Sequence, residues 1–233
     1  YTNVEKELII TETNVDTLEF IDIICNLNGK LRTLVEGKDY IVLESGAEIG
    51  WKQYRYQILK ENFAEDGHYT ITIYSKDRAK NVSDNQSKGK SLSFAVDKKP
   101  PSIVLSGIEQ KGRYRENSRE ILLDVKDNLA IASLTVNLDG ETAVYDQEAL
   151  NAFKGKVSVT ARGKNKWQTL KVSAEDQAGN QIEIEKITFL ITPNLWVLFY
   201  NHKPLFYGSI ITILLSALIG FSCLVYSKRK RNV

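Results

Sequence analysis

The sequence is poor in the residue types that most often carry chemistry. Its 233 residues include two histidines, two cysteines and no methionine. His68 and His202 stand in no metal-binding pattern such as HExxH, and no GxSxG, GxGxxG or P-loop motif occurs. Cys25 lies in an apolar run with no histidine nearby, which indicates a core residue and not a nucleophile. We therefore predict no catalytic residue, no cofactor and no enzymatic activity.

The two cysteines also provide no disulfide framework. Cys223 falls inside a long uncharged apolar run, residues 205–226, whereas Cys25 belongs to the N-terminal part of the chain. The 22 residues of this run make about 33 Å of helix, which is enough to cross a hydrocarbon core of about 30 Å. We therefore predict a transmembrane helix over residues 205–226, with the lipid bilayer as one partner of the chain.

The residues after this run predict its orientation. The basic tail, residues 227–233, carries four cations that form a stop-transfer signal: Lys228, Arg229, Lys230 and Arg231. We therefore expect a single-pass cell-membrane protein with an extracellular N-terminus and a cytoplasmic C-terminus. The sequence begins at Tyr1 without a signal peptide, which this topology needs, so we expect it to be a piece of a longer protein.

Charge outside the tail is nearly balanced. The chain has 31 basic and 29 acidic residues, and no acidic residue follows Leu205. Because four of the basic residues lie in the tail, the first 204 residues contain 27 basic and 29 acidic residues. Nucleic-acid binding requires clustered Lys and Arg on a folded surface. We therefore expect no nucleic-acid partner.

Four blocks of sequence recur in the same order, which indicates an internal repeat. The paired blocks are residues 1–12 and 114–125, 25–29 and 136–140, 69–81 and 168–180, and 94–97 and 189–192. The second copy is preceded by an apolar segment, residues 100–107, that resembles an opening strand and has no counterpart in the first copy. We therefore expect the first copy to lack its first strand and to have an open sheet edge.

Short alternating segments separated by turn signals predict β-strands in both copies. The alternation is clear in residues 69–73 and 131–138. Near Glu185 and Lys186 it changes phase, which predicts a β-bulge. One short helical turn is expected at residues 147–153, and no other helix is expected before the transmembrane run.

The pattern predicts an all-β fold, with tandem immunoglobulin-like antiparallel β-sandwiches followed by one transmembrane α-helix. The prolines at 100 and 101 stiffen the linker between the sandwiches, so we expect a semi-rigid rod. The predicted segments are a sandwich without its first strand at 1–97, a complete sandwich at 98–192, a juxtamembrane segment at 193–204, the helix at 205–226 and the basic cytoplasmic tail at 227–233.

Several motifs resemble the bacterial immunoglobulin-like repeats that form tandem arrays in large surface proteins, especially of Gram-positive bacteria. The resemblance covers about residues 1–192 and is weaker in the first copy, where Lys80 replaces the glycine found at Gly179. It implies the C-terminal, membrane-anchored end of a bacterial cell-surface protein. The absence of a cross-sheet disulfide, which animal domains of this type usually carry, points the same way. The motifs are residues 96–103, Gly107, Asp127-Asn128, residues 138–140 and residues 176–180.

The loop at Asp176, Gly179 and Asn180 has two interpretations. As a structural turn, Asp176 accepts backbone N–H groups and Gly179 supplies a positive φ. As part of a calcium site between domains, its carboxylate offers a hard oxygen ligand. No run approaches the DxDxDG density of a dedicated site, so we favour the turn and predict no metal site. The calcium candidates are Asp97, Asp127, Asn128 and Asp176, with Asp77, Asp84 and Asp97 as a second set.

Three aromatic residues, Trp51, Tyr54 and Tyr56, lie in residues 37–63, a segment for which the second copy shows no counterpart. Exposed aromatic rings could stack on sugar rings, whereas extra strands would place them in cross-strand pairs. The sequence favours the strands. The segment is nevertheless the best candidate for a surface that binds an extracellular glycan or protein.

We therefore predict a non-catalytic membrane-anchored stalk of a bacterial surface protein that positions upstream domains outside the cell. No LPxTG-like motif precedes the helix, so we expect retention in the membrane. Two alternatives stay open. One is an adhesion module that binds glycan or protein through the first domain, and the other is the anchor of an extracellular enzyme whose catalytic domain lies upstream.

Overall fold

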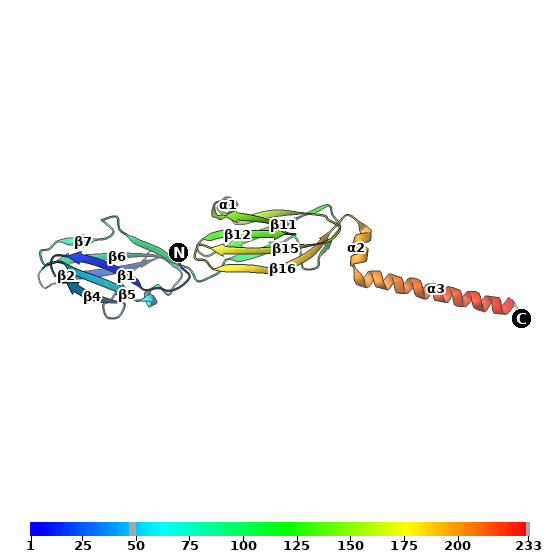
Figure 1. Cartoon of the computed structure of the whole chain (residues 1–233), viewed down its shortest axis with the longest axis horizontal. Helices are drawn as coiled ribbons and strands as arrows, with labels where there is room; N and C mark the ends of the chain where they lie inside the picture. Colours follow the sequence, from blue (N-terminus) through cyan, green and yellow to red (C-terminus); the bar gives the residue numbers. More distant parts are fainter. Residues whose placement is uncertain (47–49, 232–233) are drawn as a thin grey trace.

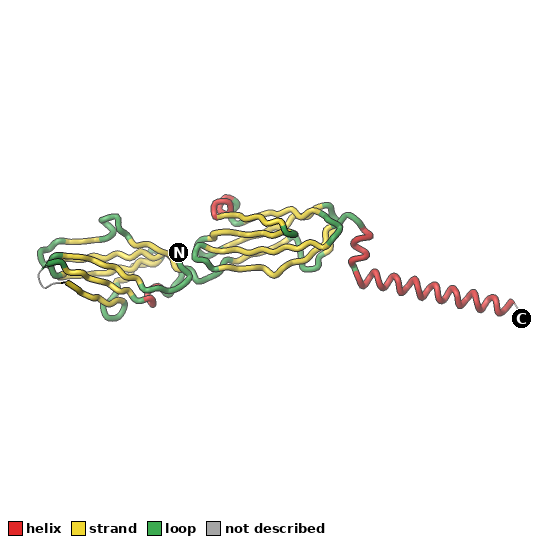
Figure 2. The backbone as a smooth tube through the Cα atoms, in the orientation of Figure 1, coloured by secondary structure: helices red, strands yellow, loops and turns green. Residues whose placement is uncertain are grey.

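Two β-sandwiches lie end to end, and a long helix leaves the far end of the second (Figure 1). The computed structural model describes the backbone of residues 1–46 and 50–231, and side chains as far as Ser227. Strands account for most of both sandwiches, and the longest helix comes after them (Figure 2). The predicted fold class, antiparallel β-sandwiches followed by one apolar helix that could cross a membrane, is confirmed.

The N-terminal sandwich is built from two sheets with strand orders β1-β5-β4 and β3-β2-β6-β7, and β8 also pairs with β6. Inward-facing residues of both sheets form one core, in which Ile23, Tyr56 and Phe63 are fully buried. Cys25 is 4% exposed, as predicted for a core cysteine. The elements are β1 (Leu8–Asn14), β2 (Leu18–Leu27), β3 (Lys30–Thr33), β4 (Tyr40–Gly46), β5 (Lys52–Ile58), the 3-10 helix η1 (Lys60–Phe63), β6 (Gly67–Asp77), β7 (Val82–Asp84) and β8 (Leu92–Val96).

The C-terminal sandwich has sheets with strand orders β10-β16-β15-β12-β13 and β14-β11-β9, and a separate core lies between them. A short helix, α1, comes after β13 where the sequence predicted a helical turn. The elements are β9 (Ser102–Ser106), β10 (Arg113–Tyr114), β11 (Ser118–Lys126), β12 (Ile131–Leu138), β13 (Glu141–Asp146), α1 (Gln147–Ala152), β14 (Lys156–Arg162), β15 (Trp167–Asp176) and β16 (Gln181–Ile191).

The predicted bulge in the last strand is confirmed. Leu170 pairs with Ile187 and Val172 pairs with Ile184, so two residues of β16, 185 and 186, oppose one residue of β15. The extra residue shifts the side-chain alternation by one position. Ile184 and Ile187 therefore both pack against the core, although they stand three residues apart.

Strand pairing shows how the two sandwiches differ. In the C-terminal sandwich β11 lies between β14 and β9. Its counterpart β1 pairs with β5 and has no strand on its other side within the described residues. β4 instead borders the far side of β5. Because β5 takes the place of β14, β4 and the short helix η1 are the additions within this segment, and the expectation that residues 37–63 have no counterpart is wrong.

Two helices come after the second sandwich. α2 (Leu195–Asn201) was not expected from the sequence; the side chain of Asn194 caps it by accepting the Trp196 N–H at 2.9 Å. α3 (Lys203–Arg231) runs five residues past the predicted membrane segment, and its part from Lys203 to Ser227 is unburied and apolar and long enough to cross a membrane. The side chains of the predicted stop-transfer residues lie outside the described part: Lys228, Arg229, Lys230 and Arg231.

The structure predicts a stabilising change at Lys80, which stands at the repeat position of Gly179. Lys80 has φ 69°, and Gly179 has φ 87°. A side chain in this left-handed region costs about 1–2 kcal/mol, while the greater freedom of glycine in the unfolded chain costs about 0.5–1 kcal/mol. We expect Lys80→Gly to raise the free energy of unfolding by about 0.5 kcal/mol, as measured by denaturant unfolding. Lys80→Ala is the control, because it removes the exposed ion pair with Glu19 and keeps the Cβ atom. A glycine variant less stable than the alanine variant would contradict the prediction.

Candidate metal centre

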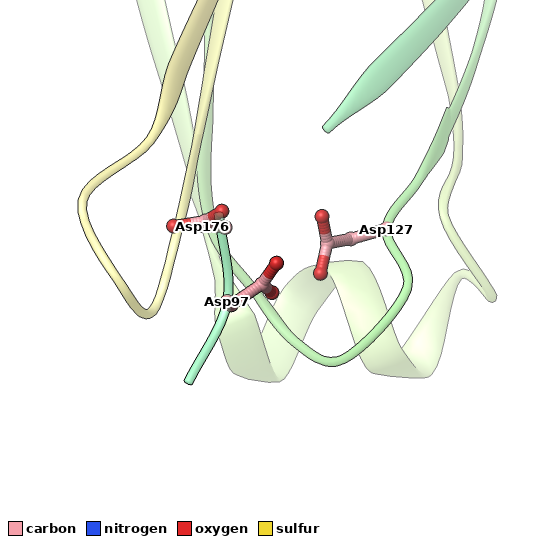
Figure 3. Close-up of side chains that lie close together, drawn as sticks. All are labelled: Asp97, Asp127 and Asp176. Carbon is pink, nitrogen blue, oxygen red and sulfur yellow. The ribbon is translucent and has the colours of Figure 1, made fainter. Parts of the chain in front are cut away.

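Three carboxylates meet where the two sandwiches join. Asp97 comes after β8 at the end of the N-terminal sandwich, whereas Asp127 comes after β11 and Asp176 ends β15 in the C-terminal sandwich. One oxygen of each lies within 4.8 Å of the others. Asp97 points into the space between the other two (Figure 3).

Asp176 holds the loop after β15. Its Oδ1 accepts the backbone N–H groups of Ala178 and Asn180, both at 2.8 Å, and its Oδ2 accepts the side-chain N–H of Asn180 at 2.7 Å. The positive φ of Gly179 lets the chain turn back into β16. These contacts give Asp176 a structural task that needs no ion.

The first sandwich contains the same loop without an acid at the repeat position of Asp127. Asp77 accepts the backbone and side-chain N–H groups of Asn81, both at 2.8 Å. Asn14 occupies the repeat position of Asp127, so an uncharged amide stands there in place of a carboxylate. The Asn81 side chain is the main cause that lowers the pKa of Asp77 below its ordinary value. The loop is therefore complete by itself, and its recurrence at Asp176 is no sign of a metal.

Asp97 is different, because its charge is buried and incompletely bonded. The residue is 1% exposed. Its Oδ1 accepts the Asn128 side-chain N–H at 3.0 Å and the Lys99 backbone N–H at 3.2 Å. Its Oδ2 has no partner among the described residues. Burial raises the pKa of Asp97 above its ordinary value, and the charges of Asp127 and Asp176 act in the same direction.

Asp127 carries a second unpartnered oxygen. Its Oδ2 accepts the backbone N–H groups of Leu129 and Ala130 at 2.8 Å, while its buried Oδ1 has no partner in the described part of the chain. The neighbouring lysines do not compensate these charges, since Lys98 pairs with Glu5 and Lys99 pairs with Asp66. No described Lys or Arg lies within 4.0 Å of the three carboxylates.

The geometry of this group suits a hard cation. Calcium binds oxygen atoms at about 2.3–2.6 Å, so oxygens that share one ion lie at most about 5 Å apart. Of the four sequence candidates, the structure brings the three aspartates together, and Asn128 contacts Asp97 through its amide nitrogen. Asp77 and Asp84, named as a second set, do not belong to the group.

The aromatic candidates for a binding surface do not form one. Tyr54 is 4% exposed and Tyr56 is fully buried, because both face inward on β5. The Tyr56 hydroxyl donates to Glu12 at 2.9 Å, and the Tyr54 hydroxyl accepts the Leu18 N–H at 3.1 Å. Trp51, outside β5, is 67% exposed. The favoured interpretation, in which these residues belong to a strand, therefore holds for Tyr54 and Tyr56, and the alternative of an exposed aromatic platform does not.

The burial of Tyr56 and the exposure of Trp51 predict that truncating the first side chain destabilises the fold strongly and that truncating the second hardly changes its stability. We expect Tyr56→Ala to lower the free energy of unfolding by about 3–5 kcal/mol, because it leaves a large core cavity and removes a partner of Glu12. Trp51→Ala should change it by no more than about 0.5 kcal/mol. Chemical denaturation of both variants measures the contrast. A loss of several kcal/mol on truncating Trp51 would show that its ring packs in the fold.

Comparisons with known proteins found distant similarity to solved structures and leave the function open. No protein-family model matches the chain, and a search of curated proteins found no match. Among solved structures, the chain is similar to the fibronectin(III)-like modules of Clostridium thermocellum CbhA, with TM-score 0.34, 12% identity, and coverage of 82% of this chain and 88% of that one. It is also similar to a Ca2+-stabilized adhesin that helps an Antarctic bacterium bind ice, with TM-score 0.29, 15% identity, and coverage of 81% and 44%. Similarity this distant carries no argument about what this chain binds.

Proposed function

We propose that the chain is a non-catalytic, membrane-anchored stalk of a bacterial surface protein, with its N-terminus outside the cell and its C-terminus in the cytoplasm. The observation that carries the proposal is the order of parts along one line, in which two sandwiches placed end to end precede an apolar helix (Figure 1). A short segment separates the second sandwich from that helix, since β16 ends at Ile191 and α3 begins at Lys203. The second sandwich therefore stands close to the bilayer.

Aromatic side chains gather at the start of α3. The rings of Phe199 and Tyr200 both meet Phe206 edge-on, with ring centroids 5.7 and 5.1 Å apart. The ammonium group of Lys203 lies 4.1 Å from the centre of the Tyr200 ring. Aromatic and basic side chains favour the boundary between water and lipid. The position of this cluster supports an outer membrane surface near residues 196–207.

The second sandwich is tied to this cluster by a side-chain contact. The indole N–H of Trp167, at the start of β15, donates to the Asn201 side chain in α2 at 2.9 Å. The guanidinium group of Arg113 covers the Trp167 ring at 5.4 Å. The Trp167 ring therefore lies at the end of the second sandwich that faces α2. This contact would limit how far the sandwich tilts on the membrane.

The linker between the sandwiches is fixed on both sides, which supports a mechanical role. Asp97 donates its backbone N–H to Thr2 at 2.9 Å, and its carbonyl accepts the Asn180 side chain at 2.9 Å. Lys98 donates its backbone N–H to Asp66 at 3.0 Å. Hydrogen bonds therefore connect the linker to the N-terminal sandwich and to the loop after β15. Such a joint resists bending better than a free linker of the same length.

Cysteine labelling tests the anchoring and its direction. The chain is produced behind a secretory signal in a bacterial host, with Cys223→Ser to remove the exposed native thiol; Cys25 is buried. We expect a membrane-impermeant maleimide to label Ser87→Cys on intact cells and to label Ser227→Cys only after permeabilisation. The reverse pattern would overturn the orientation. As a control, Leu214→Arg with Leu218→Arg should release the protein from the membrane fraction, because each charge costs about 2.5–3.5 kcal/mol at the bilayer centre. Retention of that variant would contradict anchoring by α3.

A further inference from the structure

We propose that Asp97, Asp127 and Asp176 bind one calcium ion, which fastens the linker of the first sandwich to the second sandwich. This proposal does not depend on the proposed stalk function, because calcium binding can be measured whether or not the chain is anchored in a membrane. Two of its ligands belong to the second sandwich, and Asp97 belongs to the connection between the two. An ion held by all three would act as a cross-link between consecutive sandwiches.

The unpartnered oxygens distinguish this group from an ordinary acidic cluster. Asp97 is only 1% exposed, and its free Oδ2 belongs to a carboxylate that points toward the other two (Figure 3). The Oδ1 of Asp127 is likewise buried and free among the described residues. A buried charge is normally paired or coordinated to a metal. Here three negative groups share one small space, with no described cation within ion-pair distance.

The internal repeat supplies comparisons within the same chain. At the repeat position of Asp127 the first sandwich has Asn14, an uncharged amide, and the Asp77 carboxylate of that loop accepts hydrogen bonds from Asn81. At the repeat position of Asp97 the second sandwich has Thr192, a buried residue whose hydroxyl donates to Asn165. In the described part of the chain, Thr192 is followed by the helices α2 and α3. Within the described residues all three acids therefore occur together only where one sandwich is followed by another.

The donor set favours calcium over other divalent ions. All three ligands are carboxylate oxygens, whereas zinc sites are built mainly from sulfur and nitrogen. Magnesium requires near-ideal octahedral geometry at about 2.0–2.1 Å and usually keeps several waters, with only one or two carboxylates as protein ligands. Calcium accepts six to eight oxygens in irregular arrangements at longer distances. Water and the Asn128 amide, rotated so that its oxygen replaces its nitrogen, would complete the shell.

Calorimetric titration of the full chain in detergent micelles tests the site, with calcium ions alone as the probe after removal of metals by a chelator. We expect one ion per chain with Kd of about 10⁻³ M or tighter. Asp97→Asn and Asp127→Asn should each weaken binding by about tenfold or more, because each removes one ligand charge. Asp22→Asn, a carboxylate of β2 outside the group, should bind like the parent chain. No binding to the parent chain, or unchanged binding to both asparagine variants, would overturn the proposal.

Thermal unfolding distinguishes an ion site from a purely structural hydrogen-bond network. In chelator, Asp97→Asn should melt at or above the temperature of the parent chain, because it removes a buried unpaired charge. In saturating calcium the order should reverse, since the ion raises the parent Tm by about 5 °C or more. Asp127→Asn provides the same comparison if the Asp97 variant does not fold. A variant that lowers Tm equally in chelator and in calcium would show that the carboxylate serves only hydrogen bonding.

Discussion

The arrangement of the two sandwiches depends on how Asp97 is held between them. The backbone of Asp97 bonds to Thr2 of the first sandwich and to Asn180 of the second, so the residue is held in place from both sides. This position takes its charge out of water and sets it beside Asp127 and Asp176. The position of Asp97 therefore both joins the sandwiches end to end and brings three carboxylates together without a compensating cation among the described residues. Any group that relieves the negative charge there also strengthens the connection.

The second sandwich meets different partners at its two ends. Toward the first sandwich it presents the acidic group, and toward α2 it presents Trp167, which bonds to Asn201. The residue after its last strand, Thr192, is uncharged and hydrogen-bonded within the sandwich. The second sandwich therefore forms a polar joint with the first sandwich at one end and an aromatic contact with α2 at the other. The proposed stalk would need both contacts, because force would pass through the two sandwiches to the proposed anchor.

Local patterns allowed much of the fold to be predicted. The phase change near Glu185 indicated the bulge, and the uncharged run of residues 205–226 indicated the apolar helix, because both depend on side chains adjacent in sequence. The equivalence of β5 and β14 escaped detection, since strands in the same place of a sandwich need share only their alternation. The choice between a buried and an exposed position for Tyr54 and Tyr56 stayed open for a similar reason, because sequence alone does not say which face of a strand is covered.

The acidic group could be predicted only in part. Asp127 and Asp176 lie in recognisable turn motifs, but their distance from each other and from Asp97 is set by strand pairing across the sandwich and by the path of the linker. Three separate segments contribute the three side chains, so no single stretch of the sequence shows the density of carboxylates that marks a dedicated calcium loop. The sequence also does not show which carboxylate oxygens are buried without a hydrogen-bond partner, because that depends on how the surrounding backbone folds.

The stiffness of the joint between the sandwiches is the central claim, and pulsed electron spin resonance measures it directly. Nitroxide labels at Ser87→Cys in the first sandwich and Val144→Cys in the second, with Cys223→Ser, report the distance between the two units in the full chain. A single narrow distance distribution in calcium, broadening when the ion is chelated, is the expected result. A broad distribution in saturating calcium would contradict the claim, because it would mean that the linker bends freely despite the contacts of Asp97.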